Sequence, residues 1–518
     1  MNDAPIQPSN TTARAARPSI VESFKIEGLY GYRTISLESD YAATILIARN
    51  GTGKTTLLGA LDAFLRLQFT RLRELEFSRI TCSLRGIEND LVMTHDDLVE
   101  FLQIPTDHEF SRVAARTGLA AEVLFHYIVH DYPSMTREEI RSSDDKTTAA
   151  LRSGFGFSLR EQEATLEKIR VSLFSRQENI NLIWSAVSAV LHDTEIVYLP
   201  TYRRVELALL DDAARSPYTR RQAPKFNVAA GSLYTGDIQF GLADISDRLS
   251  VLHNQIVNAS NNGYRQISAN IINDLIDGSF ADQDIAPDAL PTKDELGLFF
   301  SRLKENRRVS PLPTVDAPNL DKLYTTDAVP QASQKFLPYF LAQLGKVIDT
   351  AKAVEAPVDA FIDSCNKYLQ SDEPSTELSA EEKLDISRDS KTLRLNRRNL
   401  SVYVESAVQG RRISLNALSS GEKQMISLFA KLFLYPKKKL VLIDEPELSL
   451  SIDWQATILV DVLNAPLCEQ VIAITHSPFV FENELDPFAR AVTIKTYIPE
   501  EAELTLDDGA TTDFDDVE

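Results

Sequence analysis

One short segment constrains the fold of this chain more than any other: a glycine-containing loop between a strand-like run and a helix-like run. The apolar run ATILIA leads into the sequence A48-R49-N50-G51-T52-G53-K54-T55-T56, and apolar residues then recur at helical spacing over 57–65. A loop that wraps phosphate groups needs glycines where backbone N–H groups converge, followed by a lysine and a hydroxyl. The segment therefore predicts a phosphate-binding strand, loop and helix, in which Ala48 stands where the motif has its first glycine. The alternative is a glycine turn that binds nothing.

The residues of this loop have distinct expected roles. Lys54 would reach the β- and γ-phosphates of a nucleotide, and Thr55 would offer its hydroxyl to Mg²⁺. The helix that starts there would direct the positive end of its dipole at the anion. The candidate ATP-binding residues are Asn50, Gly51, Thr52, Gly53, Lys54, Thr55 and Thr56.

A second motif is the apolar run K439-L440-V441-L442-I443, which ends in Asp444 and Glu445. A continuous apolar run of this length is typical of a buried parallel strand, whose carboxyl end carries the chemistry. Asp444 is the candidate Mg²⁺ partner, and Glu445 is the candidate base for the water that attacks the γ-phosphate. Taken without the glycine loop, the two carboxylates could have no role beyond ending a strand.

A third motif, A417-L418-S419-S420-G421-E422, precedes a run with one apolar helical face. Ser419, Ser420 and Gly421 are therefore expected at a helix N-terminus, where hydroxyls and free N–H groups can hold an anion. The alternative is an ordinary serine cap.

In this order the motifs resemble those of the ATP-binding-cassette superfamily. ARNGTGKT is similar to its phosphate loop, LSSGEKQ to its signature, LVLIDEP to its magnesium strand, PELSLSID to the loop that follows, and VIAITHS to its switch histidine. The resemblance implies a head-to-tail dimer with two sandwiched ATP molecules, in which the signature of one subunit closes on the γ-phosphate held by the other. It also implies that His476 senses the γ-phosphate, although a lone histidine at a strand end is otherwise usually structural.

The fold class expected from these patterns is α/β: a β-rich lobe and a parallel-sheet core, interrupted by two mainly helical blocks. Thr55 and Leu418 lie 363 residues apart (418 − 55), much further than in a transporter cassette. The expected parts are a disordered start (1–18), an ATPase lobe with the phosphate loop (19–70), a helical insertion (71–194), a return to the head (195–240), a helical arm (241–382), the remaining head (383–499) and an acidic tail (500–518).

Large helical insertions at this position resemble the DNA-repair and chromosome-structure (SMC-like) ATPases and their relatives in bacterial anti-phage systems. FKIEGLYGYRTISL, VYLPTYRRVE and DEPELSLSIDWQ look most like the latter, in particular the ATPase subunit of Septu-type systems, including retron-associated ones. That resemblance implies a separately encoded HNH-type nuclease as partner, since only 42 residues (518 − 476) follow His476, and a retron reverse transcriptase with its DNA/RNA hybrid as a further partner. The alternatives are a RecF-like repair ATPase that acts on DNA ends or gaps, and a scaffold whose ATP is structural.

Two further groups are assigned through the resemblance. Tyr30, Tyr32 and Arg33 lie where relatives contact adenine, and simple packing of an aromatic hairpin tip is the equal alternative. Arg203, Arg204 and Glu206 are candidates for the lobe-coupling loop, in which no clear glutamine is present.

His126 and His130 with Asp131 form an in-chain alternative for metal binding, because histidines at i and i+4 can share an ion. HYIVHD has no glutamate at the position of the base in HExxH, and an amphipathic helix face is the favoured interpretation.

Charge argues weakly against a general nucleic-acid-coating protein, since 54 basic and 75 acidic residues give a net charge of −21. Nine of the acidic residues lie in 500–518, which has no basic residue and could dock on a partner or cover a basic groove. Basic pairs at 203/204, 220/221, 307/308, 397/398 and 411/412 would form such a groove if the fold gathered them. Three isolated cysteines and the lack of any signal-peptide or membrane-spanning apolar run predict a cytoplasmic chain with reduced thiols.

Overall fold

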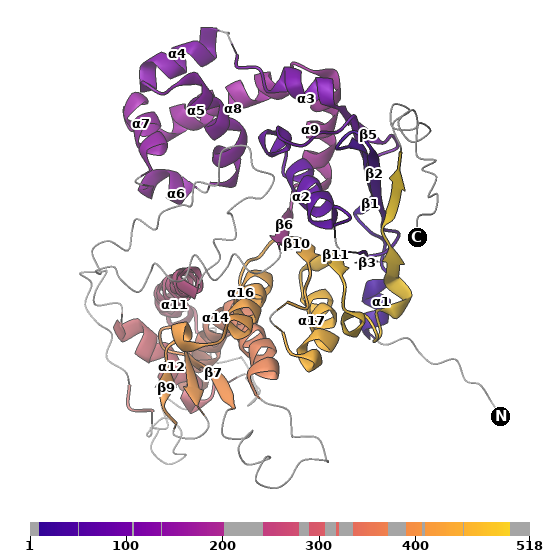
Figure 1. Ribbon diagram of the computed structural model, residues 1–518. Coiled ribbons are helices and arrows are strands. Elements are labelled where there is room, and N and C mark those ends of the chain that lie inside the picture. The colour runs from indigo at the N-terminus through magenta and orange to yellow at the C-terminus, as the bar shows by residue number, and fades with distance from the viewer. Residues whose placement is uncertain are drawn as a thin grey trace, which may run out of the picture. The chain divides into compact units, whose positions relative to one another are not determined.

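The computed structural model describes most of the chain (Figure 1). The described residues are 10–49, 51–105, 108–135, 137–143, 145–200, 242–278, 290–305, 318–320, 335–370, 390–406, 410–448 and 450–497. The chain forms two compact units: the first comprises Met1–Gln239 with Lys437–Glu518, and the second comprises Phe240–Pro436. Asn50, the candidate loop at 203–206, the basic pairs at 220/221 and 307/308 and the acidic tail lie outside the described residues.

The first unit contains a parallel sheet at its core, with the strand order β12-β3-β11-β10-β6. All of its neighbouring strands run parallel; in the central pair, Ile443 of β10 lies opposite Ala473 of β11. After Lys438 every residue of β10 is buried, as expected for a strand covered on both faces. The bounds are β3 Ala43–Ile47, β6 Thr194–Leu199, β10 Lys438–Asp444, β11 Cys468–Thr475 and β12 Ala489–Ala491.

Two helices of the first unit lie next to strands of this sheet in the sequence. Helix α2 (Lys54–Leu65) follows β3 through the glycine loop, and α17 (Ile452–Asn464) lies between β10 and β11 in the sequence. Because the strands are parallel, the carboxyl ends of β3, β10 and β11 meet at one edge. The expected α/β class is confirmed.

A second, antiparallel sheet of the first unit has the order β13-β2-β1-β4-β5. In β1 the buried side chain of Phe24 lies opposite Leu37 on β2 and Cys82 on β4. The bounds are β1 Val21–Leu29, β2 Arg33–Glu38, β4 Arg79–Leu84, β5 Leu91–Thr94 and β13 Thr493–Thr496. Strands β4 and β5 fall inside the range 71–194 that was expected to be mainly helical, so the β-rich lobe extends further along the chain than the sequence pattern indicated.

The other elements that the structure describes between β5 and β6 are helices and helical turns. Buried phenylalanines form a connected aromatic cluster: the ring of Phe69 contacts those of Phe101 and Phe174 at centroid distances of 5.6 and 6.0 Å. The helices are α3 His95–Phe101, α4 His108–Thr117, α5 Ala121–His126, α6 Arg137–Ser142, α7 Lys146–Gly154, α8 Leu159–Phe174 and α9 Glu178–Val190, with 3-10 turns at Phe69–Leu72 and Tyr132–Ser134 and a π-helical turn at Tyr127–Asp131.

The start of the chain corrects one expectation. Residues 1–18 were expected to be disordered, but Asn10–Ala15 form helix α1. The guanidinium of Arg14 donates to the carbonyl oxygens of Asn464 and Ala465 at the end of α17. A helix C-terminus leaves carbonyls without intrahelical partners, and a cation there is favourable, which explains why this segment is held.

The second unit combines long helices with a small antiparallel sheet, in the order β7-β8-β9. A buried ion pair joins Arg302 to Glu355, and the same guanidinium donates to the carbonyl of Arg397. The bounds are α11 Leu242–Asp277, α12 Lys293–Glu305, α14 Phe336–Leu369, α16 Ser420–Phe433, β7 Lys391–Asn396, β8 Ser401–Ser406 and β9 Arg412–Ile413. Three 3-10 turns complete the described elements: Leu415–Ala417 here, and Pro478–Val480 and Asp486–Phe488 in the first unit.

The signature motif lies in this second unit rather than with the phosphate loop. The sequence pattern grouped it with the head at 383–499, but the chain divides between Pro436 and Lys437. Cys82, Cys365 and Cys468 are buried free thiols, as expected. None of the helices in the described parts of the chain is long and apolar enough to span a membrane.

Candidate nucleotide-binding site

The phosphate loop has the backbone that an anion cradle needs. Gly51 and Gly53 have φ values of 76° and 91°, in the left-handed region that side chains disfavour. Gly53 is the N-cap of α2 and offers no side chain to the first helical N–H groups. Thr52 Oγ1 donates to the carbonyl of Arg49 at 2.8 Å, which closes the turn. No side chain at the N-cap position therefore competes with an anion for the first N–H groups of α2, and the positive end of the helix dipole is directed at the loop.

Helix α2 is itself anchored by charge at its far end. Asp62 is buried and lies 2.6 Å from both Arg66 Nε and Arg71 Nη1. Burial alone would raise the pKa of Asp62, but the two guanidiniums more than offset it and lower the pKa below its ordinary value. The helix that presents Lys54 is thus fixed to its surroundings by a buried ionic cluster.

The phosphate loop and the magnesium strand meet, although about 390 residues separate them. Thr55 Oγ1 donates to Asp444 Oδ2 at 2.6 Å, and Lys54 Nζ lies 3.4 Å from Glu445 Oε1. Lys54 is only 5% exposed and Asp444 is fully buried. The parallel register of β3, β11 and β10 brings them together.

This oxygen pair fits a magnesium ion. Mg²⁺ takes hard oxygen ligands at about 2.1 Å in an octahedron, whose neighbouring ligands lie about 3 Å apart. The hydroxyl of Thr55 and the carboxylate of Asp444 are such ligands at nearly this separation. They could hold the ion together with nucleotide phosphates.

Glu445 has a strained backbone and a carboxylate that lies between the side chains of Lys54 and His476. Its φ is 54°, unusual for a residue other than glycine, and its N–H donates to Ile474 O at 2.8 Å. The carboxylate oxygen Oε1 that faces Lys54 also lies 3.7 Å from His476 Nε2. The structure therefore places the candidate base, the phosphate-loop lysine and the switch histidine in one cluster.

Sequence reasoning assigned no role to Glu447, which holds the switch loop. Its carboxylate accepts hydrogen bonds from Thr475 Oγ1 at 2.8 Å and from the backbone N–H groups of His476 and Ser477 at 2.8 and 3.3 Å. Burial raises the pKa of Glu447, and the nearby carboxylate of Glu445 adds to this. The third carboxylate in D444-E445-P446-E447 was the available signal, but only the fold shows what it contacts.

The hairpin tip with the two tyrosines lies next to the phosphate loop. Arg33 Nη1 donates to Gly51 O at 3.1 Å, and its guanidinium stacks over the ring of Tyr32 at 5.1 Å. Tyr30 and Tyr32 are 46% and 36% exposed. Both tyrosines of this hairpin are thus partly accessible to solvent, and adenine contact stays a prediction.

The signature residues form a locally satisfied helix start in the second unit. Ser419 caps α16 and makes a capping box with Glu422, whose carboxylate accepts from both the hydroxyl and the N–H of Ser419. Lys391 Nζ lies 2.8 Å from the same carboxylate. Ser419 and Ser420 are accessible, whereas Gly421 is buried. The serine-cap alternative therefore describes Ser419, and anion binding by Ser419, Ser420 and Gly421 stays a prediction.

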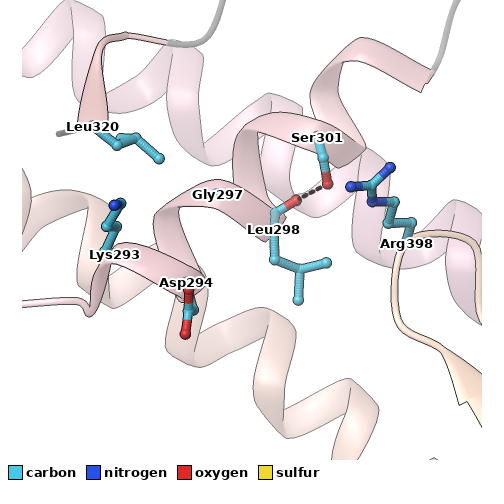
Figure 2. Close-up of a pocket in the computed structure, with 7 residues that line it drawn as sticks. All are labelled: Lys293, Asp294, Gly297, Leu298, Ser301, Leu320 and Arg398. Atoms are coloured by element: carbon cyan, nitrogen blue, oxygen red, sulfur yellow. Dashed lines mark hydrogen bonds between the residues drawn. The ribbon is translucent and has the colours of Figure 1, made fainter.

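In each of the two basic pairs that the structure describes, 397/398 and 411/412, one arginine contacts an acidic or aromatic side chain, and so does the neighbouring Arg394. Arg394 pairs with Glu405, Arg397 pairs with Asp359, and Arg412 stacks on Tyr403. A shallow hollow of about 410 Å³ in this unit (Figure 2) is lined by Lys293, Asp294, Gly297, Leu298, Ser301, Leu320 and Arg398. Its mixed lining does not form a continuous basic groove.

Part of this chain matches the model of a known protein family. Residues 239–482, just under half of the chain, match the family model described as "AAA domain, putative AbiEii toxin, Type IV TA system". The match includes the signature, Asp444, Glu445 and His476, and begins after the phosphate loop. No curated protein matches this chain. A crystal structure of the Smc head domain with an extended coiled coil, bound to the C-terminal domain of ScpA, from Pyrococcus furiosus, is similar at a TM-score of 0.31 and 12% identity, over 94% of this chain and 98% of that one.

Proposed function

We propose that this chain binds and hydrolyses ATP as the regulatory subunit of an anti-phage defence complex. The ATPase part rests on one observation: Lys54 and Thr55 of the phosphate loop meet Glu445 and Asp444 at the edge of the parallel sheet. A buried lysine, a hydroxyl–carboxylate pair and a second carboxylate are what phosphoryl transfer to water requires.

Each side chain has a role that follows from its position. Mg²⁺ held by Thr55 and Asp444 would neutralise phosphate charge. Lys54 exchanges its contact with Glu445 for the β- and γ-phosphates when ATP enters. Glu445, released from that ion pair, accepts a proton from the attacking water, and His476 on the adjacent loop responds to the γ-phosphate.

Assembly completes the site in this proposal. Two copies close head to tail around two ATP molecules, and the N-terminus of α16 in one copy faces the γ-phosphate bound by the other. The position of Ser419 and Ser420 at the N-terminus of α16, where neither residue is buried, supports this role. Closure then restrains or licenses a separately encoded HNH-type nuclease, with a retron reverse transcriptase and its DNA/RNA hybrid as a further partner. The toxin named in the description of the matching family supports a defence setting.

The ATPase part is tested by ATP binding and turnover in Lys54→Ala. Turnover and ATP binding should both be lost, because the alanine leaves no cation for the phosphates. Lys346→Ala is the matched control, since Lys346 is an exposed lysine of α14. Unchanged turnover in Lys54→Ala would overturn the ATPase assignment.

The defence part is tested separately, in cells. Phage plating should rise on a strain with Lys54→Ala, and an HNH nuclease should co-purify with the wild-type chain. If plating is unchanged and no nuclease co-purifies, the defence assignment is wrong. Sensitivity of a deletion strain to DNA damage, without phage sensitivity, would select the repair ATPase instead.

A further inference from the structure

A second cluster of potential ligands lies in the helical block of the first unit, at the end of α5 (Figure 1). His126, His130 and Asp131 each offer one ligand atom, and these three atoms lie within 4.8 Å of one another. His130 Nδ1 is 3.2 Å from Asp131 Oδ1, and His126 Nδ1 is 3.7 Å from Asp131 Oδ2. The two imidazole rings stack with centroids 4.9 Å apart. The proposed ATPase chemistry uses none of these residues.

The backbone at this point explains why three neighbouring residues converge. In an α-helix each residue turns by about 100°, so a residue five positions on lies well off the face of the first. Here Tyr127–Asp131 form a π-helical turn directly after His126. Its wider i→i+5 bonding brings residues at i+4 and i+5 over residue i. The turn therefore brings Asp131 next to the two histidines at i and i+4. In a regular α-helix Asp131 would lie on a different face.

We propose that His126, His130 and Asp131 bind a divalent transition metal ion, with Zn²⁺ as the ion that they match best. Imidazole nitrogens and a carboxylate oxygen are its ordinary ligands at about 2.1 Å, which places tetrahedral ligands about 3.4 Å apart. His130 Nδ1 lies 3.2 Å from Asp131 Oδ1, close to that value, and His126 Nδ1 lies 3.7 Å from the other carboxylate oxygen, Oδ2. Two imidazoles also favour zinc over Mg²⁺ or Ca²⁺, which take oxygen ligands.

The surroundings allow an ion to enter and bind. The side chains of His126, His130 and Asp131 are 31%, 13% and 41% exposed, so the ligands are reachable from solvent. Three protein ligands leave the fourth position to water or to a donor from outside the cluster.

The test is metal binding by the full chain after removal of metals. Titration with ZnCl₂ should fill one tight site per chain, and Co²⁺ should give visible d–d bands without thiolate charge transfer, since no cysteine belongs to the cluster. Zinc should also raise the thermal unfolding midpoint. All three signals should be lost in the double variant His126→Ala/His130→Ala and strongly weakened in Asp131→Asn.

Two controls separate this site from other binding. His192→Ala removes an exposed histidine outside the cluster and should bind zinc as the wild type does. Asp444→Asn alters the proposed magnesium site and should keep the tight zinc site. Circular dichroism shows whether each variant folds, and ATP binding is a second check for the variants of His126, His130, Asp131 and His192. A folded double variant that still binds one zinc, or a wild-type chain that binds none, overturns the proposal and leaves a hydrogen-bonded His–Asp–His cluster.

Discussion

Glu447 in the first unit and Glu422 in the second make similar hydrogen bonds in opposite electrostatic surroundings. Glu447 accepts from the hydroxyl of Thr475 and from two backbone N–H groups at the end of β11. Glu422 accepts from the hydroxyl and N–H of Ser419 at the start of α16. Each carboxylate thus fixes a segment that carries a candidate nucleotide-site residue: His476 after β11, and Ser419 at the start of α16.

The neighbouring charge differs. Burial raises the pKa of both, but for Glu422 the contact with Lys391 and the hydrogen bonds from Ser419 reverse this and lower it. For Glu447 burial prevails, and the carboxylate of Glu445 adds to it. The signature cap is therefore stabilised within its own unit, whereas the hold of Glu447 on the loop after β11 is exposed to the charge of Glu445, the candidate base beside it.

The largest expected effect comes from Glu445→Gln, which removes both the proposed base and the charge beside Glu447. ATP turnover should fall about a hundred- to ten-thousandfold, because no carboxylate then accepts the proton of the attacking water. ATP binding should persist, since Lys54 and Thr55 are unchanged. A phosphate-release assay measures turnover, and calorimetry measures ATP binding. If Glu445→Gln hydrolyses ATP as fast as the wild type, Glu445 is not the base.

Glu447→Gln should have a smaller effect, because Glu447 positions the switch loop and has no proposed contact with ATP. The amide keeps one acceptor oxygen but cannot hold all three donors as a carboxylate does. Displacement of His476 should lower kcat between about tenfold and a hundredfold, with KM for ATP little changed. Glu482→Gln, at an exposed glutamate nearby, is the matched control. A rise in KM alone would show that Glu447 acts on binding.

The sequence was sufficient for the parts of the site that local patterns encode. The phosphate loop and the magnesium strand each have a local pattern, and the parallel strands then had to bring Thr55 to Asp444. Glu447 was not predicted, since its role depends on β11 ending beside the residue after β10. Strands β4 and β5 are short segments next to helices, so helical periodicity obscured them. The π-helical turn after His126 has no sequence pattern that distinguishes it from an α-helix.

Lys391→Met should destabilise the second unit modestly. Removal of the ammonium leaves Glu422, which is 8% exposed, without its cation. Because Lys391 is 29% exposed and partly screened, the expected loss is about 1 kcal/mol in the free energy of unfolding. Urea unfolding measures this, with Lys346→Met as an exposed lysine control. An equal change in both variants would mean that the pair contributes nothing specific.

The smallest effect tests the sign of the two pKa shifts. Glu447 has a raised pKa in the folded chain, so its contribution to stability is present below its ordinary value of 4.5 and is lost as pH rises through the folded pKa. Glu422 has a lowered pKa, so its contribution is present above 4.5 and is lost as pH falls through the folded pKa. Relative to wild type, Glu447→Gln should therefore gain stability as pH rises above 4.5, and Glu422→Gln should gain stability as pH falls below 4.5. Urea unfolding of the two variants across this pH range compares them directly. Parallel pH profiles would show that the contact with Lys391 does not give Glu422 a pKa shift opposite to that of Glu447.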